Sequence, residues 1–134
     1  MALKLSLKPS ETFIVNGAVM QNGDRRGVIL LQNQARVLRE KDVMREAEAT
    51  TLCRQLYFAI MLHYLAGETS GVVHDRLDRI LATCLVATHS AAERAKLLEI
   101  SALIAEGRAY RALVLARGFY TDMEAGPAAG CGDR

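Results

Sequence analysis

The sequence predicts an α+β protein, with a small N-terminal antiparallel β unit of about five short strands and a C-terminal bundle of about four helices. Three observations lead to this prediction. Residues 3–8 alternate strictly between apolar and polar side chains, as in a strand with one buried face. Residues 16–27, NGAVMQNGDRRG, contain two Asn-Gly pairs, which favour tight hairpin turns. From Val43 onward, the apolar residues change to the three-four spacing of helices.

The expected strands are short and lie close together in the sequence. They cover residues 3–8, 13–15, 18–20, 27–31 and 35–38, with the Asn-Gly pairs as turns and Gln32–Gln34 as a loop. The run GVILL at 27–31 is apolar on both faces, which predicts a central or doubly covered strand. Such a unit is marginal alone and needs a further surface to pack against. We therefore expect a β unit at 1–43, a helical part at 44–124 and a disordered tail at 125–134.

The first predicted helix is apolar over most of its circumference. One face follows the three-four spacing of a helix and consists of Cys53, Leu56, Tyr57, Ile60, Met61 and Tyr64. Gly67 suits the C-terminal cap of this helix. A second helix is expected over about 71–88. A third begins at a capping box formed by Ser90 and Glu93 and ends at Gly107. A fourth carries Tyr110, Leu113, Val114 and Phe119.

Composition limits the classes of function. The longest apolar stretch, residues 56–66, is too short to span a bilayer, and the N-terminus lacks the pattern of a secretory signal. The three cysteines have no metal-ligand spacing and fit a reducing cytoplasm. We therefore expect a cytoplasmic protein with no membrane association.

No catalytic motif or cofactor motif appears in the sequence. There is no P-loop, GxGxxG, GxSxG or HExxH pattern, so we expect neither an enzyme nor a cofactor. His63, His74 and His89 lie on three segments and could converge on a metal, but locally satisfied histidines are the simpler interpretation, so we predict no metal site. Asp75 and Asp78 alternate with arginines on a helix, which favours a solvated charged face over acid–base chemistry.

Basic residues are concentrated in the N-terminal part. Residues 1–45 carry eight basic and four acidic groups, a balance of +4, whereas residues 46–134 have a balance of −2, with nine basic and eleven acidic groups. This asymmetry suggests an anionic partner for the β unit, and a solvated basic face is the alternative. The candidate RNA-binding residues are Arg39, Lys4, Ser6, Lys8, Arg36, Lys41, Arg25 and Arg26. Arg39 is the foremost candidate, because it lies where a strand meets a helix start and an arginine fork can contact phosphate or guanine.

Several motifs together resemble the FlbT family of flagellar regulators. These are LKLSLKP, NGDRRG, LQNQARVLRE and YFAIMLHYL, and the resemblance covers roughly residues 2–122. It implies a cytoplasmic, post-transcriptional regulator that binds the 5′ leader of flagellin mRNA and alters its stability or translation. It also implies a link to the flagellar protein FlaF and to flagellin.

A fainter resemblance to the carbon storage regulator family, CsrA, concerns residues 3–43. The alternating first strand and VLREKDV stand in the order of that family's first and last strands, and Leu5, Lys8 and Arg39 match. Leu7 and Leu38 depart from its Arg and His. In that family two β units interlace into a dimer, so the resemblance implies a homodimer in which Lys4, Ser6, Lys8 and Arg39 meet across the subunit boundary. A monomer whose helices cap the β unit is the alternative.

A second function class is a protein-binding module. The first helix, through Tyr57, Phe58, Met61 and Tyr64, would take up a helix of flagellin or FlaF, as an export chaperone does. The competing interpretation places this helix at the bundle centre. The two function classes are compatible in one protein.

Overall fold

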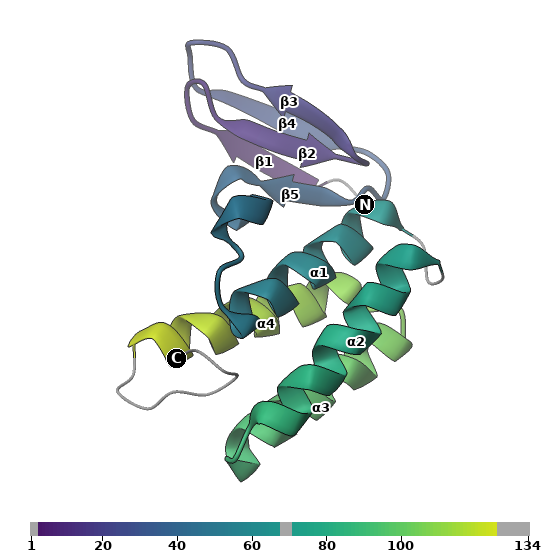
Figure 1. The fold of residues 1–134 in the computed structure, drawn as a ribbon. Coiled ribbons are helices and arrows are strands. Elements are labelled where there is room, and N and C mark those ends of the chain that lie inside the picture. The colour runs from purple at the N-terminus through teal and green to yellow at the C-terminus, as the bar shows by residue number, and fades with distance from the viewer. Residues whose placement is uncertain (1–2, 68–70, 126–134) are drawn as a thin grey trace. The chain divides into compact units, whose positions relative to one another are not determined.

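The computed structural model describes residues 3–67 and 71–125, and it confirms the α+β class (Figure 1). The chain divides into two compact units, residues 1–43 and 44–134, which we call the β unit and the helical unit. The β unit contains β1 (Leu3–Leu7), β2 (Thr12–Val15), β3 (Ala18–Gln21), β4 (Gly27–Leu31), β5 (Val37–Arg39) and the 3-10 turn η1 (Glu40–Asp42). The helical unit contains the 3-10 turn η2 (Glu46–Glu48) and the helices α1 (Leu52–Ala66), α2 (Val72–Ala87), α3 (Ala91–Ala105) and α4 (Ala109–Ala125). Apart from Ala125, the tail expected at 125–134 lies outside the described residues.

The five strands form two antiparallel sheets. In one sheet β1 pairs with β4, in a register that runs from Leu3 opposite Leu31 to Leu7 opposite Gly27. In the other, β2 lies between β3 and β5. Because β5 comes last in the chain and pairs with β2, it brings Arg39 opposite Phe13 near the start of β2.

The two Asn-Gly pairs behave differently. Asn16 and Gly17 have φ angles of 50° and 84°, so they form the tight β2–β3 hairpin turn that the sequence predicts. Gly23 is not among the residues with positive φ, and the strands on either side of Asn22-Gly23 belong to different sheets. The Asn22 side-chain amide instead donates to the carbonyl oxygens of Lys8 and Arg25, at 2.8 Å each. The prediction of a second tight Asn-Gly turn is therefore wrong.

Strand β4 is not a central strand. In the described part of the chain it pairs with β1 alone, and Val28 and Leu30 are each 56% exposed. These two face the same way as Lys4 and Ser6, which lie opposite them in the register. The prediction of a doubly covered strand is wrong, because an apolar run does not by itself show that both faces are covered. The last strand also begins later than expected, at Val37.

Helix α1 forms the centre of the helical unit, packed beside both α2 and α4, while α3 packs on α4 (Figure 1). Leu56 and Ile60 are fully buried, and the Tyr57 ring meets the Tyr120 ring edge-on with centroids 5.3 Å apart. Thr51 caps the start of the helix, and Gly67 ends it in the left-handed region, as predicted. No helix in the described part of the chain is long and apolar enough to cross a membrane.

The start of α3 differs in detail from the expected capping box. The Ser90 hydroxyl accepts the Glu93 amide as predicted, but the Glu93 carboxylate accepts the Thr88 hydroxyl at 2.6 Å. Thr88 in turn accepts the Ser90 amide, so a buried threonine takes the place expected for Glu93.

Candidate nucleic-acid interface

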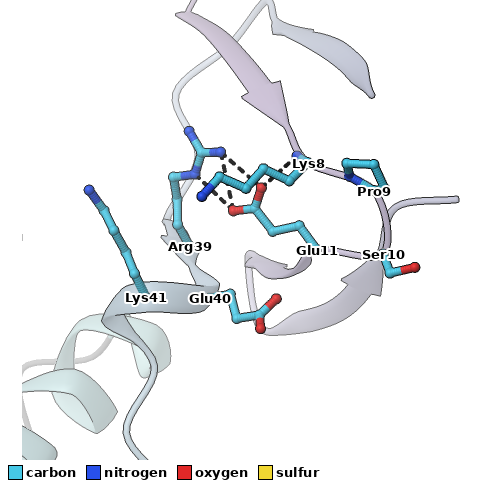
Figure 2. Close-up of a pocket in the computed structure, with 7 residues that line it drawn as sticks. All are labelled: Lys8, Pro9, Ser10, Glu11, Arg39, Glu40 and Lys41. Atoms are coloured by element: carbon cyan, nitrogen blue, oxygen red, sulfur yellow. Dashed lines mark hydrogen bonds and ion pairs between the residues drawn. The ribbon is translucent and has the colours of Figure 1, made fainter. Parts of the chain in front are cut away.

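The β unit contains an open pocket of about 650 Å³ (Figure 2). It is lined by Lys8, Pro9, Ser10, Glu11, Arg39, Glu40 and Lys41. The segment after β1 supplies the first four residues, and the end of β5 with η1 supplies the rest. Three cations and two carboxylates therefore surround one space, and three of these five charges, on Lys8, Arg39 and Lys41, belong to candidates that the sequence singles out.

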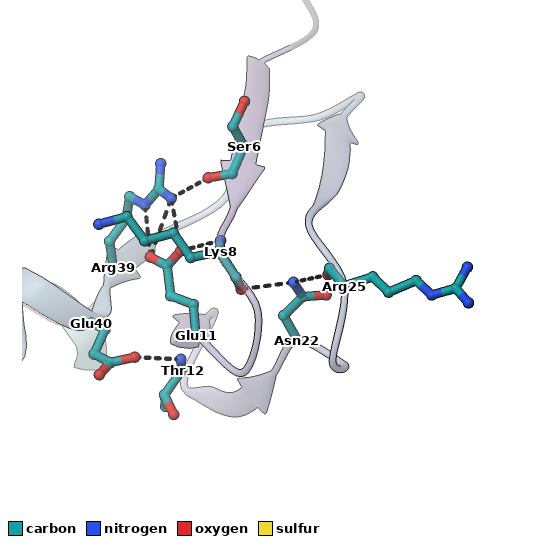
Figure 3. Close-up of polar contacts among 8 residues, drawn as sticks. All are labelled: Ser6, Lys8, Glu11, Thr12, Asn22, Arg25, Arg39 and Glu40. Carbon is teal, nitrogen blue, oxygen red and sulfur yellow. Dashed lines mark hydrogen bonds and ion pairs between the residues drawn. The ribbon is translucent and has the colours of Figure 1, made fainter.

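The side chain of Arg39 is held from two sides. Its Nη2 lies 3.1 Å from both carboxylate oxygens of Glu11, and its Nε donates to Glu11 Oε2 at 3.2 Å. Nη2 also donates to the carbonyl oxygen of Ser6 in β1 (Figure 3). These hydrogen bonds fix the orientation of the guanidinium group. Arginine binds carboxylate and phosphate groups in the same way, through two of its N–H groups. Arg39 therefore already holds an anionic group within the β unit.

Glu11 is placed by the tight connection between β1 and β2. Its Oε1 accepts the Lys8 amide at 2.9 Å, and its own amide donates to the Lys8 carbonyl at 3.1 Å. Ser10 turns the chain with a positive φ of 63°. The Lys8 amide, followed by the hydrogen bond and charge of Arg39, holds the pKa of Glu11 below its usual value, although burial acts in the opposite direction.

The second carboxylate of the pocket has a different partner. Glu40 accepts the Thr12 amide at 2.7 Å and so ties η1 to the start of β2. Lys8 and Lys41 are exposed, with their side chains at the border of the pocket (Figure 2). The pocket therefore offers two exposed lysine side chains beside one guanidinium group that is held by hydrogen bonds.

The structure brings only part of the predicted RNA-binding set together. Lys8, Arg39 and Lys41 line one pocket, and Ser6 joins them through its carbonyl oxygen. Ser6 also lines a second, smaller pocket of about 170 Å³, together with Arg26. Lys4 lies on the exposed face of the β1–β4 sheet, Arg25 is exposed in the β3–β4 connection, and Arg36 lies beside the Asn16 turn. None of these last three lines the larger pocket.

Sequence reasoning missed Glu11 and Glu40 as members of this site. Glu11 directly follows the Pro9-Ser10 turn, and Glu40 directly follows Arg39. These positions, beside a turn and beside an arginine, were an available signal. Their pairing with Arg39 and Thr12, both 28 residues away along the chain, needed the fold.

The predicted protein-binding residues are mostly inside the helical unit. Tyr57, Phe58 and Met61 are buried, which is the bundle-centre arrangement, and Tyr64 is half-buried against the Tyr110 ring at a centroid distance of 5.5 Å. The first three do not form an open groove in this structure. Partner binding through this helix stays a prediction.

Two of the histidines approach each other. The rings of His63 and His74 lie 5.6 Å apart, and His74 Nε2 is 3.4 Å from Asp78 Oδ2. Burial, and then the neighbouring His74, lowers the pKa of His63. Among the described residues there is no group of three or more side chains that could hold a metal ion.

Fold and pocket together define a small two-unit α+β protein whose β unit presents an open pocket with charges of both signs around Arg39. The family described as "Flagellar protein FlbT" matches residues 3–126, nearly the whole chain. The chain belongs to the FlbT family, as its motifs predict.

Relatives with known names support this membership. The chain is 44% identical over 117 residues to a "Probable flagellum biosynthesis repressor protein FlbT" of Caulobacter sp. strain K31, covering 87% of this chain and 89% of the relative. It is 42% identical over 117 residues to the "Flagellum biosynthesis repressor protein FlbT" of Caulobacter vibrioides strain ATCC 19089, covering 87% and 83%. A relative from Agrobacterium fabrum, named as probable, is 34% identical over 122 residues, covering 89% and 79%. No solved structure matches the chain, and the resemblance to CsrA stays a prediction.

Proposed function

We propose that this protein regulates flagellar synthesis after transcription by binding the 5′ leader of flagellin mRNA through the pocket around Arg39. The names of the relatives, flagellum biosynthesis repressors, support the flagellar role. The resemblance of the motifs to FlbT supports the messenger as target. One observation carries the choice of site: the Arg39 guanidinium is oriented toward an anionic group, between two exposed lysines.

The arrangement suits a phosphate backbone more than a lone small molecule. Phosphate contacts come mainly from lysine and arginine side chains and position the protein on the nucleic acid. Lys8 and Lys41 can follow successive phosphates, because their long side chains are exposed. Ser6 and Arg26 extend the polar surface to the second, smaller pocket.

The test is a titration of the purified protein with a flagellin leader RNA at two salt concentrations. Arg39→Gln should weaken binding about tenfold and reduce the salt dependence, since it removes one oriented cation. Arg54→Gln is the matched control, because Arg54 also forms a two-bond pair with a glutamate, Glu124, at 2.5 and 2.9 Å, but in the helical unit. If Arg39→Gln binds the leader as tightly as the wild type, Arg39 does not contact the RNA. If the wild type does not bind the leader at either salt concentration, direct RNA recognition is refuted.

A second candidate function is binding of flagellin or FlaF. It is favoured by the Tyr64–Tyr110 ring pair, because Tyr110 and its neighbour one turn later, Val114, are about half exposed. A pull-down of flagellin that persists after nuclease treatment and is lost on Tyr64→Glu would support it. Val72→Glu, at an 81% exposed position on α2, is the control and should leave the pull-down intact. A flagellin signal that disappears with nuclease would refute this candidate.

A further inference from the structure

The Arg39 fork is occupied by a side chain of the same chain. Arg39 Nη2 lies 3.1 Å from Glu11 Oε1 and Nε lies 3.2 Å from Oε2, in the two-bond arrangement that two oxygens of a phosphate or sulfate can also adopt. An oxyanion that approaches Arg39 therefore meets a filled position. This matters for any ligand of the pocket, whatever its size.

We infer that Glu11 is a specificity-determining residue of this pocket, whose carboxylate stands in for a ligand oxyanion at Arg39 and must be displaced before that ligand can bind. When a single oxyanion displaces Glu11, Arg39 exchanges one ion pair for another, so the net free energy of binding is small. A polyanion that also reaches Lys8 and Lys41 gains contacts that Glu11 does not provide. Glu11 thus selects for chains of phosphates over free phosphate.

The local geometry allows this exchange without unfolding the turn. The Arg39 side chain is 30% exposed, so a ligand can approach it from solvent, whereas the Glu11 side chain is 11% exposed. Glu11 also accepts the Lys8 amide through Oε1, and a glutamine at this position retains that acceptor while losing the charge. Glu11→Gln therefore separates the competing charge from the structural hydrogen bond.

Glu40 provides a matched control in the same pocket. Its carboxylate accepts the Thr12 amide, whereas Glu11 is the carboxylate that binds Arg39. Glu40→Gln removes one negative charge from the pocket, as Glu11→Gln does, but leaves the Arg39 fork filled. A pure effect of net charge would make the two variants equal.

The first arm of the experiment uses sulfate, whose charge is constant over the working pH range. Sulfate is titrated into the wild type and both variants, with the NMR signal of the Arg39 Nε–H as the readout. We expect Glu11→Gln to bind sulfate about fivefold more tightly than the wild type, the factor that corresponds to a partly exposed ion pair, and Glu40→Gln to change less than twofold. Equal effects of the two variants, or no effect of Glu11→Gln, would overturn the inference. Glu11→Ala should also tighten sulfate binding, and weaker binding would count against the inference.

The second arm uses the flagellin leader RNA and rests on the proposed function. Glu11→Gln should bind this RNA more tightly than the wild type, but by a smaller factor than for sulfate, because the RNA also contacts Lys8 and Lys41. Arg39→Gln should bind the RNA less tightly. If no variant binds RNA but Glu11→Gln gains sulfate affinity, the proposed function fails and the inference stands. If RNA binds and Glu11→Gln equals the wild type with both probes, the inference fails and the proposed function stands.

Discussion

The β unit and the helical unit each contain an arginine–glutamate pair that joins distant parts of the chain, but the surroundings of the two pairs differ. In the helical unit, Arg54 and Glu124 close the surface beside the Tyr120 ring, which lies 5.3 Å from the Arg54 guanidinium. Beneath them is an extensive apolar core built on α1. In the β unit, Arg39 and Glu11 lie in a pocket with further cations.

The apolar cores of the two units also differ in extent. In the described part of the β unit, the buried apolar side chains are Leu5, Leu7, Phe13, Ile14 and Leu38, whereas Val19, Val28 and Leu30 are exposed. The helical unit is therefore fixed mainly by apolar burial, and the β unit depends more on turns and polar contacts that connect its strands. An ion pair on the surface of a closed core contributes mainly to stability. We expect that an ion pair in a pocket with further charged groups can also be broken by a ligand that binds one of its two side chains. We therefore expect the largest stability effects in the helical unit and the binding effects in the β unit.

The core of the helical unit should show the largest effect. Leu97 and Leu98 are neighbours on α3, but Leu97 is fully buried and Leu98 is 53% exposed. Leu97→Ala should lower the free energy of unfolding by about 3 kcal/mol, because it leaves a cavity, and Leu98→Ala by less than about 1 kcal/mol. Urea denaturation followed by helical circular dichroism measures both. Similar losses for the two variants would contradict the packing of α3.

A substitution in the hairpin turn of the β unit should have a smaller effect. Gly17 has a φ of 84°, and an added Cβ at this position meets nothing within 4 Å, so only backbone strain opposes a side chain there. Gly17→Ala should cost about 1 kcal/mol in the free energy of unfolding. Gly23→Ala, also in open space but without a positive φ, should change it by less than about 0.5 kcal/mol. Equal costs would mean that the two Asn-Gly pairs form the same kind of turn.

These two glycines show what the sequence could and could not predict. Local signals identify the elements: alternation at β1, the Asn16-Gly17 hairpin, and the three-four spacing and Gly67 cap of α1. Partners that lie far apart in sequence were not predictable, because an apolar run such as GVILL fits either an edge or a centre of a sheet. The site shows the same limit. The candidate Arg39 comes from its residue type and position in the sequence, whereas the Glu11 carboxylate that fills its fork depends on how β2 and β5 pair.

The ion pair of the helical unit should have a smaller effect that depends on pH. The hydrogen bond from Arg54 holds the pKa of Glu124 below its usual value, and the carboxylate side chain is about one-third exposed. A lowered folded pKa stabilises the protein above the unfolded pKa, near 4.5, and this contribution is lost as pH falls through the folded pKa. Glu124→Gln should cost less than about 1 kcal/mol at neutral pH and flatten the stability profile below about pH 5.

Arg54→Gln and the double variant complete this measurement. Arg54→Gln should flatten the profile similarly, and the double variant should add little to either single change, since all three remove one interaction. Urea denaturation at a series of pH values gives the profiles. Additive losses in the double variant would show that the two side chains stabilise the helical unit independently.

The exposed face of β4 should show the smallest effect. Val28→Thr keeps the shape and the β-branching of the side chain and replaces a methyl group with a hydroxyl group. Because Val28 is 56% exposed, water can satisfy that hydroxyl, and we expect a change of less than about 0.5 kcal/mol in the free energy of unfolding. Ile14→Thr is the contrast in the same unit: Ile14 is only 8% exposed, and a change of about 2 kcal/mol or more is expected there, since apolar contacts are lost and a hydroxyl is buried. Urea denaturation compares the two. A large loss in the free energy of unfolding for Val28→Thr would mean that a second surface covers β4 in solution. A single hydroxyl group is strongly destabilising only where it is buried away from water.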